Sequence, residues 1–357
     1  MSTNQKNPLY YVWEYNDVDR NFWQEHMADW LPMKIFDAHT HINDPRHRLV
    51  KPTQAMRQQY WVNEVSEPIH ADDAKRCYAT VFPDREFSCL AFGMPSLDYD
   101  LQASNTSLQQ ATVQKGWYSL AVIRPQWSAQ TLCDLLDKEH VVGVKVYYSL
   151  ISQDTNSRDK HLEDSIYEFL PHHQLEVLNE YKSWVTLHVP KTDRLGHPDN
   201  IREILEIHAR YPDIKLVIAH FGRCYTLEHA QEALPKLSDM PGIYFDNSAV
   251  LNPQVHRYAM ELLGPNRILY GTDNPIFYMR GRRQWHKRTY TNRTNYPFYF
   301  NTDRESPEIE AHYTLYMYEA LRAIKSAAQD LNLSREEIAL LFCGNAQKLI
   351  ADCTHKI

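Results

Sequence analysis

The sequence lacks long apolar runs, and no segment approaches the roughly 20 consecutive apolar residues that span a bilayer. Its first residues also lack the basic flank and apolar stretch of a signal peptide, so we expect a cytoplasmic protein that does not associate with a membrane. The six cysteines include no C-x-x-C pair, which excludes a zinc ribbon and gives no disulfide framework. No G-x-G-x-x-G or P-loop motif follows any apolar segment, so the usual nucleotide-binding signatures are missing.

The sequence also has no excess of basic residues. The chain carries 38 basic and 45 acidic residues, which gives a net charge of −7. This balance argues against a general nucleic-acid binder and leaves a small molecule as the expected partner. Hydrophobic residues make up 43% of the 357 positions, which is enough for a packed core.

Eight short apolar segments recur along the chain and predict eight strands. Most are near-continuous apolar runs, as expected for parallel strands that are covered on both faces. Amphipathic stretches such as 200–211 and 227–237 separate them and predict helices. Eight strands that alternate with helices favour a closed (β/α)8 TIM barrel over an open doubly wound sheet, which is the structural alternative. The segments are 33–39, 87–93, 117–123, 141–148, 184–189, 214–220, 242–248 and 267–273.

Three segments exceed what a barrel needs. We predict one barrel domain over 1–357, in which residues 1–33 form an N-terminal extension that packs as an extra helix over one end. Residues 44–69 and 275–305 follow the first and the eighth predicted strand and are expected to be long loops. Loops of this length in a compact domain are usually lids or interface arms, and loops after barrel strands face the mouth where active sites lie.

Polar residues close several of the predicted strands. His39 and His41 end the first strand, and His188, His220 and Asp273 end later ones. With 18 histidines in the chain, chance supplies about one His-x-His pair, so the spacing alone decides nothing. Polar groups at the ends of apolar strands are costly unless they are paired or ligated, and five on one rim are hard to explain as core residues.

These residue types suit a metal site. Imidazole nitrogens with a carboxylate oxygen fit one divalent ion, with Zn²⁺ the best match and Mn²⁺ or Fe²⁺ also acceptable. Such an ion lowers the pKa of bound water and supplies hydroxide at neutral pH. Asp273 could hold or remove the proton of that hydroxide, and His220 could polarise the substrate or act as acid–base partner. Asp37 lies two residues before His39, and we expect it to orient an imidazole from the same strand face.

The motifs around these residues resemble those of the amidohydrolase superfamily, in the amidohydrolase-related branch that includes aminocarboxymuconate-semialdehyde decarboxylase. The resemblance covers residues 34–352. It implies that His39, His41, His188 and Asp273 are the metal ligands and that His220 is the catalytic histidine. The matching features are D-A-H-T-H at 37–41, G-V-K-V at 143–146, the histidines at the fifth and sixth strands, G-T-D-N-P at 271–275 and L-L-F-C-G-N-A-Q-K-L-I at 340–350.

Lys145 in the fourth strand has several possible roles. In binuclear members of the superfamily a lysine of this strand is carboxylated and bridges two metals. The resemblance to the mononuclear branch instead implies an unmodified Lys145 that meets an anionic substrate. A lysine that is ion-paired inside the barrel mouth is the structural alternative.

Arginines supply the other candidate anion-binding groups. Arg124 and Arg223 follow predicted strands and are well placed to bind a substrate carboxylate. The segment 279–300 contains six basic residues and no Asp or Glu. Either it is a solvated or subunit-facing arm, or one or two of its arginines reach the mouth.

The leading hypothesis is a metal-dependent hydrolase in which metal-bound hydroxide attacks a lactone, amide or related carbonyl of a small carboxylate-bearing substrate. Non-oxidative decarboxylation of an unsaturated or aromatic carboxylic acid is the alternative, because it needs the same ligands. A catalytically idle barrel with structural histidines is the third possibility. The resemblance also implies a homo-oligomer, with a dimer as the expected form.

Overall fold

A computed structural model describes residues 5–6, 14–59, 62–65, 69–152 and 158–353. Eight parallel strands follow one another in chain order, and every predicted strand is found, so the (β/α)8 barrel is confirmed. They are β3 Lys34–His41, β4 Glu86–Phe92, β5 Tyr118–Val122, β6 Val141–Val146, β7 Trp184–Leu187, β8 Lys215–Ile218, β9 Ile243–Asp246 and β10 Ile268–Leu269.

The barrel closes between its first and last strands, at the level of the site. β10 is short, and the chain that follows it pairs with β3 through a parallel bridge between Thr40 and Asn274. The backbone N–H of Asp273 donates to the carbonyl of His39 at 2.8 Å, and the N–H of His41 donates to the carbonyl of Asn274 at 2.8 Å. These bonds fix the end of β3 against the loop that carries Asp273.

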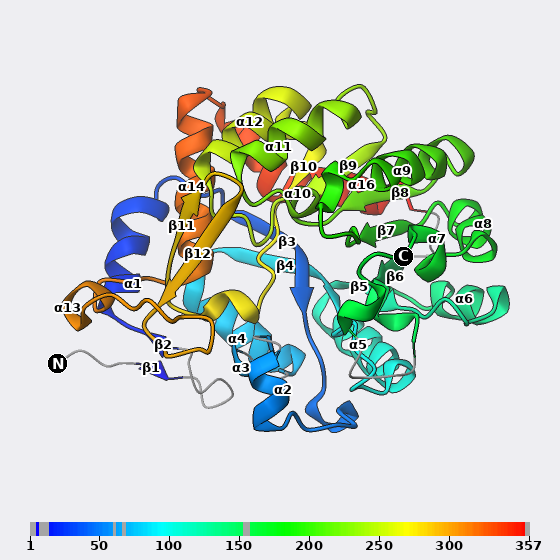
Figure 1. The fold of residues 1–357 in the computed structure, drawn as a ribbon, viewed down its shortest axis with the longest axis horizontal. Helices are drawn as coiled ribbons and strands as arrows, with labels where there is room; N and C mark the ends of the chain where they lie inside the picture. Colours follow the sequence, from blue (N-terminus) through cyan, green and yellow to red (C-terminus); the bar gives the residue numbers. More distant parts are fainter. Residues whose placement is uncertain (1–4, 7–13, 60–61, 66–68, 153–157, 354–357) are drawn as a thin grey trace.

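Helices cover the outside of the barrel (Figure 1). The predicted helix at 200–211 is α9 Pro198–Arg210, and the one at 227–237 is α11 Leu227–Ala233 followed by a 3-10 turn at Leu234–Leu237. The other long helices are α4 Ala71–Val81, α5 Leu101–Lys115, α6 Ala129–Leu136, α8 His172–Glu180, α12 Pro253–Leu263 and α14 Tyr316–Asp330, and α16 Asn345–Ala351 ends the fold. In the part of the chain that the structure describes, no helix is long and apolar enough to cross a membrane.

Packed side chains fill the barrel. One or two buried side chains from each strand except β9 join a single cluster, which α16 closes at one end with Ala346, Leu349 and Ile350. The interior is therefore a core, and reactive groups are left to the mouth. The strand residues of this cluster include Phe36, Leu90, Leu120, Val142, Trp184, Val217 and Leu269.

The N-terminal extension contains the expected extra helix. α1 Asp17–Phe22 continues into a π-helical turn at Trp23–Met27. Phe22 stacks on Tyr318 of α14 at 5.1 Å between ring centroids, and Trp23 meets Phe82 edge-on. The short strands β1 Gln5–Lys6 and β2 Glu14–Tyr15, which precede this helix in the chain, pair with each other, and residues 7–13 lie outside the described part.

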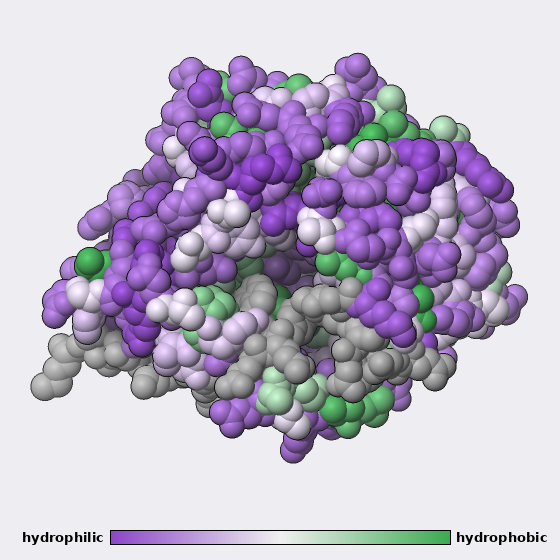
Figure 2. Space-filling model, in the orientation of Figure 1, coloured by the Kyte–Doolittle hydropathy of each residue, from purple (hydrophilic) through white to green (hydrophobic). Residues whose placement is uncertain are grey.

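The two long segments after the first and eighth barrel strands are more ordered than loops. Residues 44–69 hold a 3-10 turn at Pro45–His47 and the short helices α2 Gln54–Gln59 and α3 Val62–Val65. Residues 275–305 contain an antiparallel hairpin of β11 Gly281–His286 and β12 Thr289–Thr294. The sequence did not predict this hairpin within the long loop, because its strands are polar on both faces and show no apolar alternation. Figure 2 shows that the face toward the viewer is largely hydrophilic and is hollowed near its centre.

Candidate metal centre

Three of the four predicted ligands lie together at the mouth. The Nε2 atom of His41 lies 3.3 Å from Oδ1 of Asp273, and the Nε2 atom of His39 lies 3.5 Å from the same oxygen. All three side chains are buried. Ligand atoms about 2.1 Å from a tetrahedral ion are separated by about 3.4 Å, so this spacing fits a shared ion.

The fourth predicted ligand, His188, lies next to this group. It belongs to neither of the two described clusters whose ligand atoms all lie within 4.8 Å of one another. Its ring centroid is 5.4 Å from that of His220 and 4.6 Å from that of Tyr147. Its Nδ1 atom is buried without a hydrogen-bond partner among the described residues. An unsatisfied imidazole nitrogen beside a set of ligand atoms is compatible with ligation.

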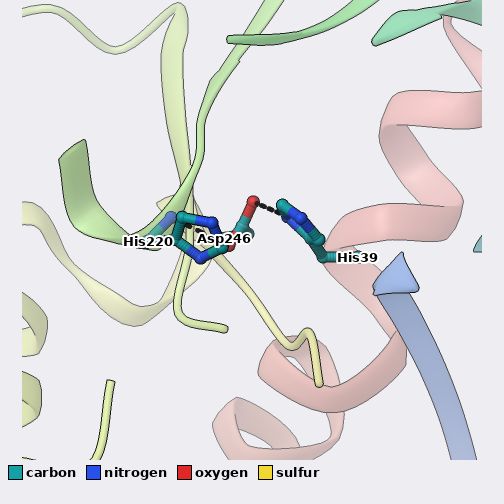
Figure 3. A group of neighbouring side chains, drawn as sticks. All are labelled: His39, His220 and Asp246. Atoms are coloured by element: carbon teal, nitrogen blue, oxygen red, sulfur yellow. Dashed lines mark hydrogen bonds and ion pairs between the residues drawn. The ribbon is translucent and has the colours of Figure 1, made fainter. Parts of the chain in front are cut away.

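Asp246, at the end of β9, organises two of the histidines (Figure 3). Its Oδ2 accepts from Nδ1 of His39 at 2.8 Å, and its Oδ1 accepts from the backbone N–H of His220 at 3.0 Å. With Nδ1 of His39 serving as the donor, the lone pair of Nε2 faces Asp273 and is available to an ion. Asp246 was not among the predicted site residues, although it too is a polar residue that closes an apolar strand.

The charges of these groups are set by burial and by each other. Burial lowers the pKa of His39 to about 3, helped by Lys145 and opposed by Asp246. Burial alone would raise the pKa of Asp273, but the bond from His41 and the nearby His220 and His39 lower it to about 2. The site therefore holds a neutral imidazole at His39 and a carboxylate at Asp273 near neutral pH, which are the forms that bind metal.

His220 lies on an unusual backbone turn. Residues His220–Arg223 form α10, in which all four residues have positive φ values between 49° and 68°. Left-handed conformation costs roughly 1–2 kcal/mol for each residue other than glycine. Contacts of the His220 side chain with Ser248 stabilise the turn. Nδ1 of His220 lies 2.8 Å from Oγ of Ser248 and 3.0 Å from the carbonyl oxygen of the same residue. Such strain is typical of functional sites, where the surrounding structure overdetermines the backbone.

Lys145 lies inside the mouth, as predicted. It is buried, with Nζ 3.4 Å from Nε2 of His39 and 4.8 Å from the ring centroid of Phe92. Burial lowers its pKa to about 8, while Asp246 and Asp273 favour the charged form. No carboxylate of the described residues lies within ion-pair distance of Nζ, and the role of Lys145 stays a prediction.

Asp37 does not orient an imidazole, and that expectation was wrong. The register of β3 against β4 shifts between Asp37 and Thr40, and this irregularity breaks the alternation that would place Asp37 and His39 on one face. The Asp37 carboxylate instead accepts from the backbone N–H groups of His39 and Thr272, from the hydroxyl of Thr272 and from Tyr78. The Asp37 carboxylate therefore links β3 to the segment that follows β10, where the barrel closes.

The predicted substrate-binding arginines lie at strand ends and lack carboxylate partners among the described residues. Arg124 follows β5, and its Nε and Nη2 atoms are buried without a hydrogen bond. Arg223 ends the left-handed turn after β8 and donates from Nη1 to the carbonyls of Lys191 and Val189. Both side chains therefore keep their positive charge uncompensated.

The basic segment 279–300 divides into paired and unpaired residues. Four of its arginines form ion pairs within the chain, which are Arg280 with Asp19, Arg282 with Glu305, Arg288 with Glu232 and Arg293 with Asp303. Arg283 is buried and forms none with the described carboxylates. The segment is thus mainly an intramolecular arm rather than a solvated basic patch.

The family model for amidohydrolases named Amidohydro_2 matches residues 98–351. A comparison with curated proteins finds no match. At the level of structure, 5-carboxyvanillate decarboxylase from Sphingomonas paucimobilis superimposes with a TM-score of 0.56 at 13% identity, covering 90% of this chain and 99% of that one.

Two further solved structures share the fold. A probable 2-pyrone-4,6-dicarboxylic acid hydrolase from Acinetobacter baumannii, with citric acid bound, gives a TM-score of 0.53 at 17% identity over 89% of this chain and 99% of that one. An amidohydrolase from Burkholderia multivorans with bound zinc gives 0.55 at 12% identity over the same shares. These identities show a common fold. Because the family model covers more than half of the sequence, this chain belongs to the amidohydrolase family that the model describes.

Proposed function

We propose that this protein is a metal-dependent hydrolase that acts on a small, carboxylate-bearing lactone, amide or related carbonyl compound. The observation that carries the proposal is the convergence of two imidazole Nε2 atoms, from His39 and His41, on one carboxylate oxygen of Asp273. This donor set fits one divalent ion, with Zn²⁺ preferred. His188 is proposed as the remaining ligand, and the zinc in the Burkholderia multivorans amidohydrolase supports the choice of metal.

An ion held there would polarise a carbonyl oxygen and lower the pKa of water. The residues of the chain would supply the proton handling. Asp273 is ionised, so its carboxylate can accept a proton from the attacking water and pass it on. His220, anchored through Nδ1 on Ser248, presents its other ring nitrogen as the acid–base partner. The packed barrel interior leaves no room for a substrate, so the reaction would take place at the mouth.

An anionic substrate is supported by the charges around the mouth. Lys145, Arg124 and Arg223 all lie at or beyond strand ends, and none has an ion-pair partner among the described residues. Lys145 is buried and Arg124 and Arg223 are partly buried, and a substrate carboxylate would supply the counter-charge that the two arginines lack. Arginine also binds a carboxylate bidentately.

Non-oxidative decarboxylation of an aromatic or unsaturated acid is the second candidate. It is favoured by Lys145, whose buried ammonium lies beside the proposed ligand His39 and could hold a carboxylate in the position where carbon dioxide leaves. Both candidates use the same ligands, so the choice depends on product analysis.

The test is turnover of the zinc-loaded full-length protein on two panels, one of lactones and amides and one of aromatic carboxylic acids. Ring opening or amide cleavage without carbon dioxide supports hydrolysis, and carbon dioxide release with inert lactones supports the second candidate. Replacement of His41 by Ala should reduce turnover at least about 100-fold and lower bound zinc. His26→Ala serves as the matched control, because His26 is exposed on the N-terminal segment. Full activity of the metal-free protein would refute both candidates.

A further inference from the structure

Arg283 differs from the other arginines of its hairpin. Its side chain is only 7% exposed, yet none of the described carboxylates pairs with it, whereas Arg280, Arg282, Arg288 and Arg293 each have one. A buried guanidinium without a counter-charge is costly. Lys287 also has no ion pair among the described residues, but it is exposed at the turn, so Arg283 is the buried cation of this segment without a described counter-charge.

The surroundings of Arg283 hold its position without neutralising it. The guanidinium lies 4.3 Å from the ring centroid of Tyr290, 5.5 Å from that of Tyr225 and 6.0 Å from that of Tyr316. Nε donates to Oδ1 of Asn292 at 2.9 Å, and Nη1 donates to a backbone carbonyl at 3.0 Å. Cation–π contacts and neutral acceptors stabilise the orientation of the group while its full charge remains.

One nitrogen of this guanidinium is left for a ligand. Nη2 of Arg283 makes no hydrogen bond with the described residues. It is also not one of the buried polar atoms that lack a partner, so this nitrogen is accessible. The planar guanidinium carries five N–H donors, of which the two named acceptors use two. A carboxylate approaching from the Nη2 side would meet a fixed, oriented donor.

The position of Arg283 connects it to the candidate site. Its Nη1 bonds the carbonyl of Ala249, and the preceding residue, Ser248, anchors His220. The Tyr225 ring, which faces Arg283, also lies 6.4 Å from the ring of His220. Ala249 and Tyr225 follow the carboxyl ends of β9 and β8, so Arg283 reaches the rim of the mouth from the hairpin.

We infer that Arg283 binds a carboxylate of the substrate at the rim, remote from the reacting group, and so selects for substrates with a second acidic group. The inference rests on the proposed function for the location of the reacting group. It concerns binding and selectivity, because Arg283 contacts the Tyr225 ring and the Ala249 carbonyl and, among the described residues, makes no hydrogen bond or ion pair with the proposed ligands. Arg124 and Arg223 would meet the substrate from other strands.

The experiment measures binding to the zinc-loaded full-length protein by calorimetry, with isophthalate as a dicarboxylate probe and isophthalamide as its neutral analogue. The wild type should bind isophthalate more tightly. Arg283→Met, which keeps the aliphatic stem under the tyrosine rings, should weaken isophthalate binding by about tenfold or more and leave isophthalamide unchanged. Arg288→Met is the matched control, since Arg288 is a half-exposed, paired arginine of the same hairpin.

Three results would overturn the inference. They are a wild type that does not prefer isophthalate, an Arg283→Met protein that binds it as well as the wild type, and a folded variant that loses both probes equally. If Arg283→Met does not fold, Arg283→Lys keeps the charge but not the fixed Nη2 donor and should reduce the preference for isophthalate; an unchanged preference in that variant contradicts the inference. Because no turnover is needed, a protein that prefers isophthalate through Arg283 but catalyses neither reaction refutes the proposed function alone.

Discussion

At the scale of single residues, the site depends on hydrogen bonds that fix which imidazole nitrogen is free. His39 donates from Nδ1 to Asp246, and His41 has its Nδ1 3.2 Å from the carbonyl of Gly93. Both Nε2 atoms therefore face the oxygen of Asp273. Carboxylate–histidine pairs of this kind commonly raise metal affinity 10–100-fold.

Asp246→Asn is expected to weaken zinc binding by about 10–100-fold, because the amide removes the charge that holds the His39 tautomer. Competition with a chromogenic chelator measures the affinity, and circular dichroism checks that the variant folds. Asp213→Asn, at an exposed position, provides the comparison and should bind zinc as the wild type does. A folded Asp246→Asn protein with wild-type affinity would remove Asp246 from the supporting set.

At the scale of elements, the left-handed turn α10 and the hairpin bring functional groups to the rim. α10 needs a glycine at its third position: φ of Gly222 is 68°, and a Cβ there would lie 2.5 Å from Cβ of Leu195. Gly271 allows a similar close approach, because a Cβ would lie 2.8 Å from Cβ of His39. Local sequence does not reveal these contacts, since each joins segments that are distant along the chain.

Gly222→Ala should lower the free energy of unfolding more than Gly116→Ala does. Both glycines have a positive φ, so each substitution costs roughly 1–2 kcal/mol in backbone strain. Gly116 has no heavy atom within 4 Å of a built Cβ, whereas Gly222 meets Leu195, which adds about 1–3 kcal/mol of overpacking. Urea unfolding measures both. Equal losses would mean that Leu195 moves aside at no cost.

At the scale of the whole molecule, a bound ion would join β3 to the segment after β10 across the barrel closure. His39 and His41 lie on one side of that seam and Asp273 on the other. Any ligand that binds the folded state alone stabilises it in proportion to its occupancy. The homodimer and the cytoplasmic location stay predictions.

Zinc added to the chelator-treated protein should therefore raise the melting temperature by several degrees, since a ligand at 100 times its Kd contributes about 2.7 kcal/mol. Differential scanning calorimetry measures the shift. Magnesium at the same concentration should produce little change, because it prefers oxygen ligands. Equal melting temperatures with and without zinc would contradict a site at the seam.

The eight strands, the barrel and most of the polar residues that close its strands could be predicted from the sequence, because parallel barrel strands are apolar along their length and polar at the mouth. The sequence did not reveal the irregularity in β3 that separates Asp37 from His39, nor the role of Asp246. Which of the arginines form ion pairs depends on the tertiary structure. Arg280, Arg282, Arg288 and Arg293 look like Arg283 in the sequence, and only their distant carboxylate partners distinguish them. Pairing across the chain depends on how elements pack, and no local pattern encodes it.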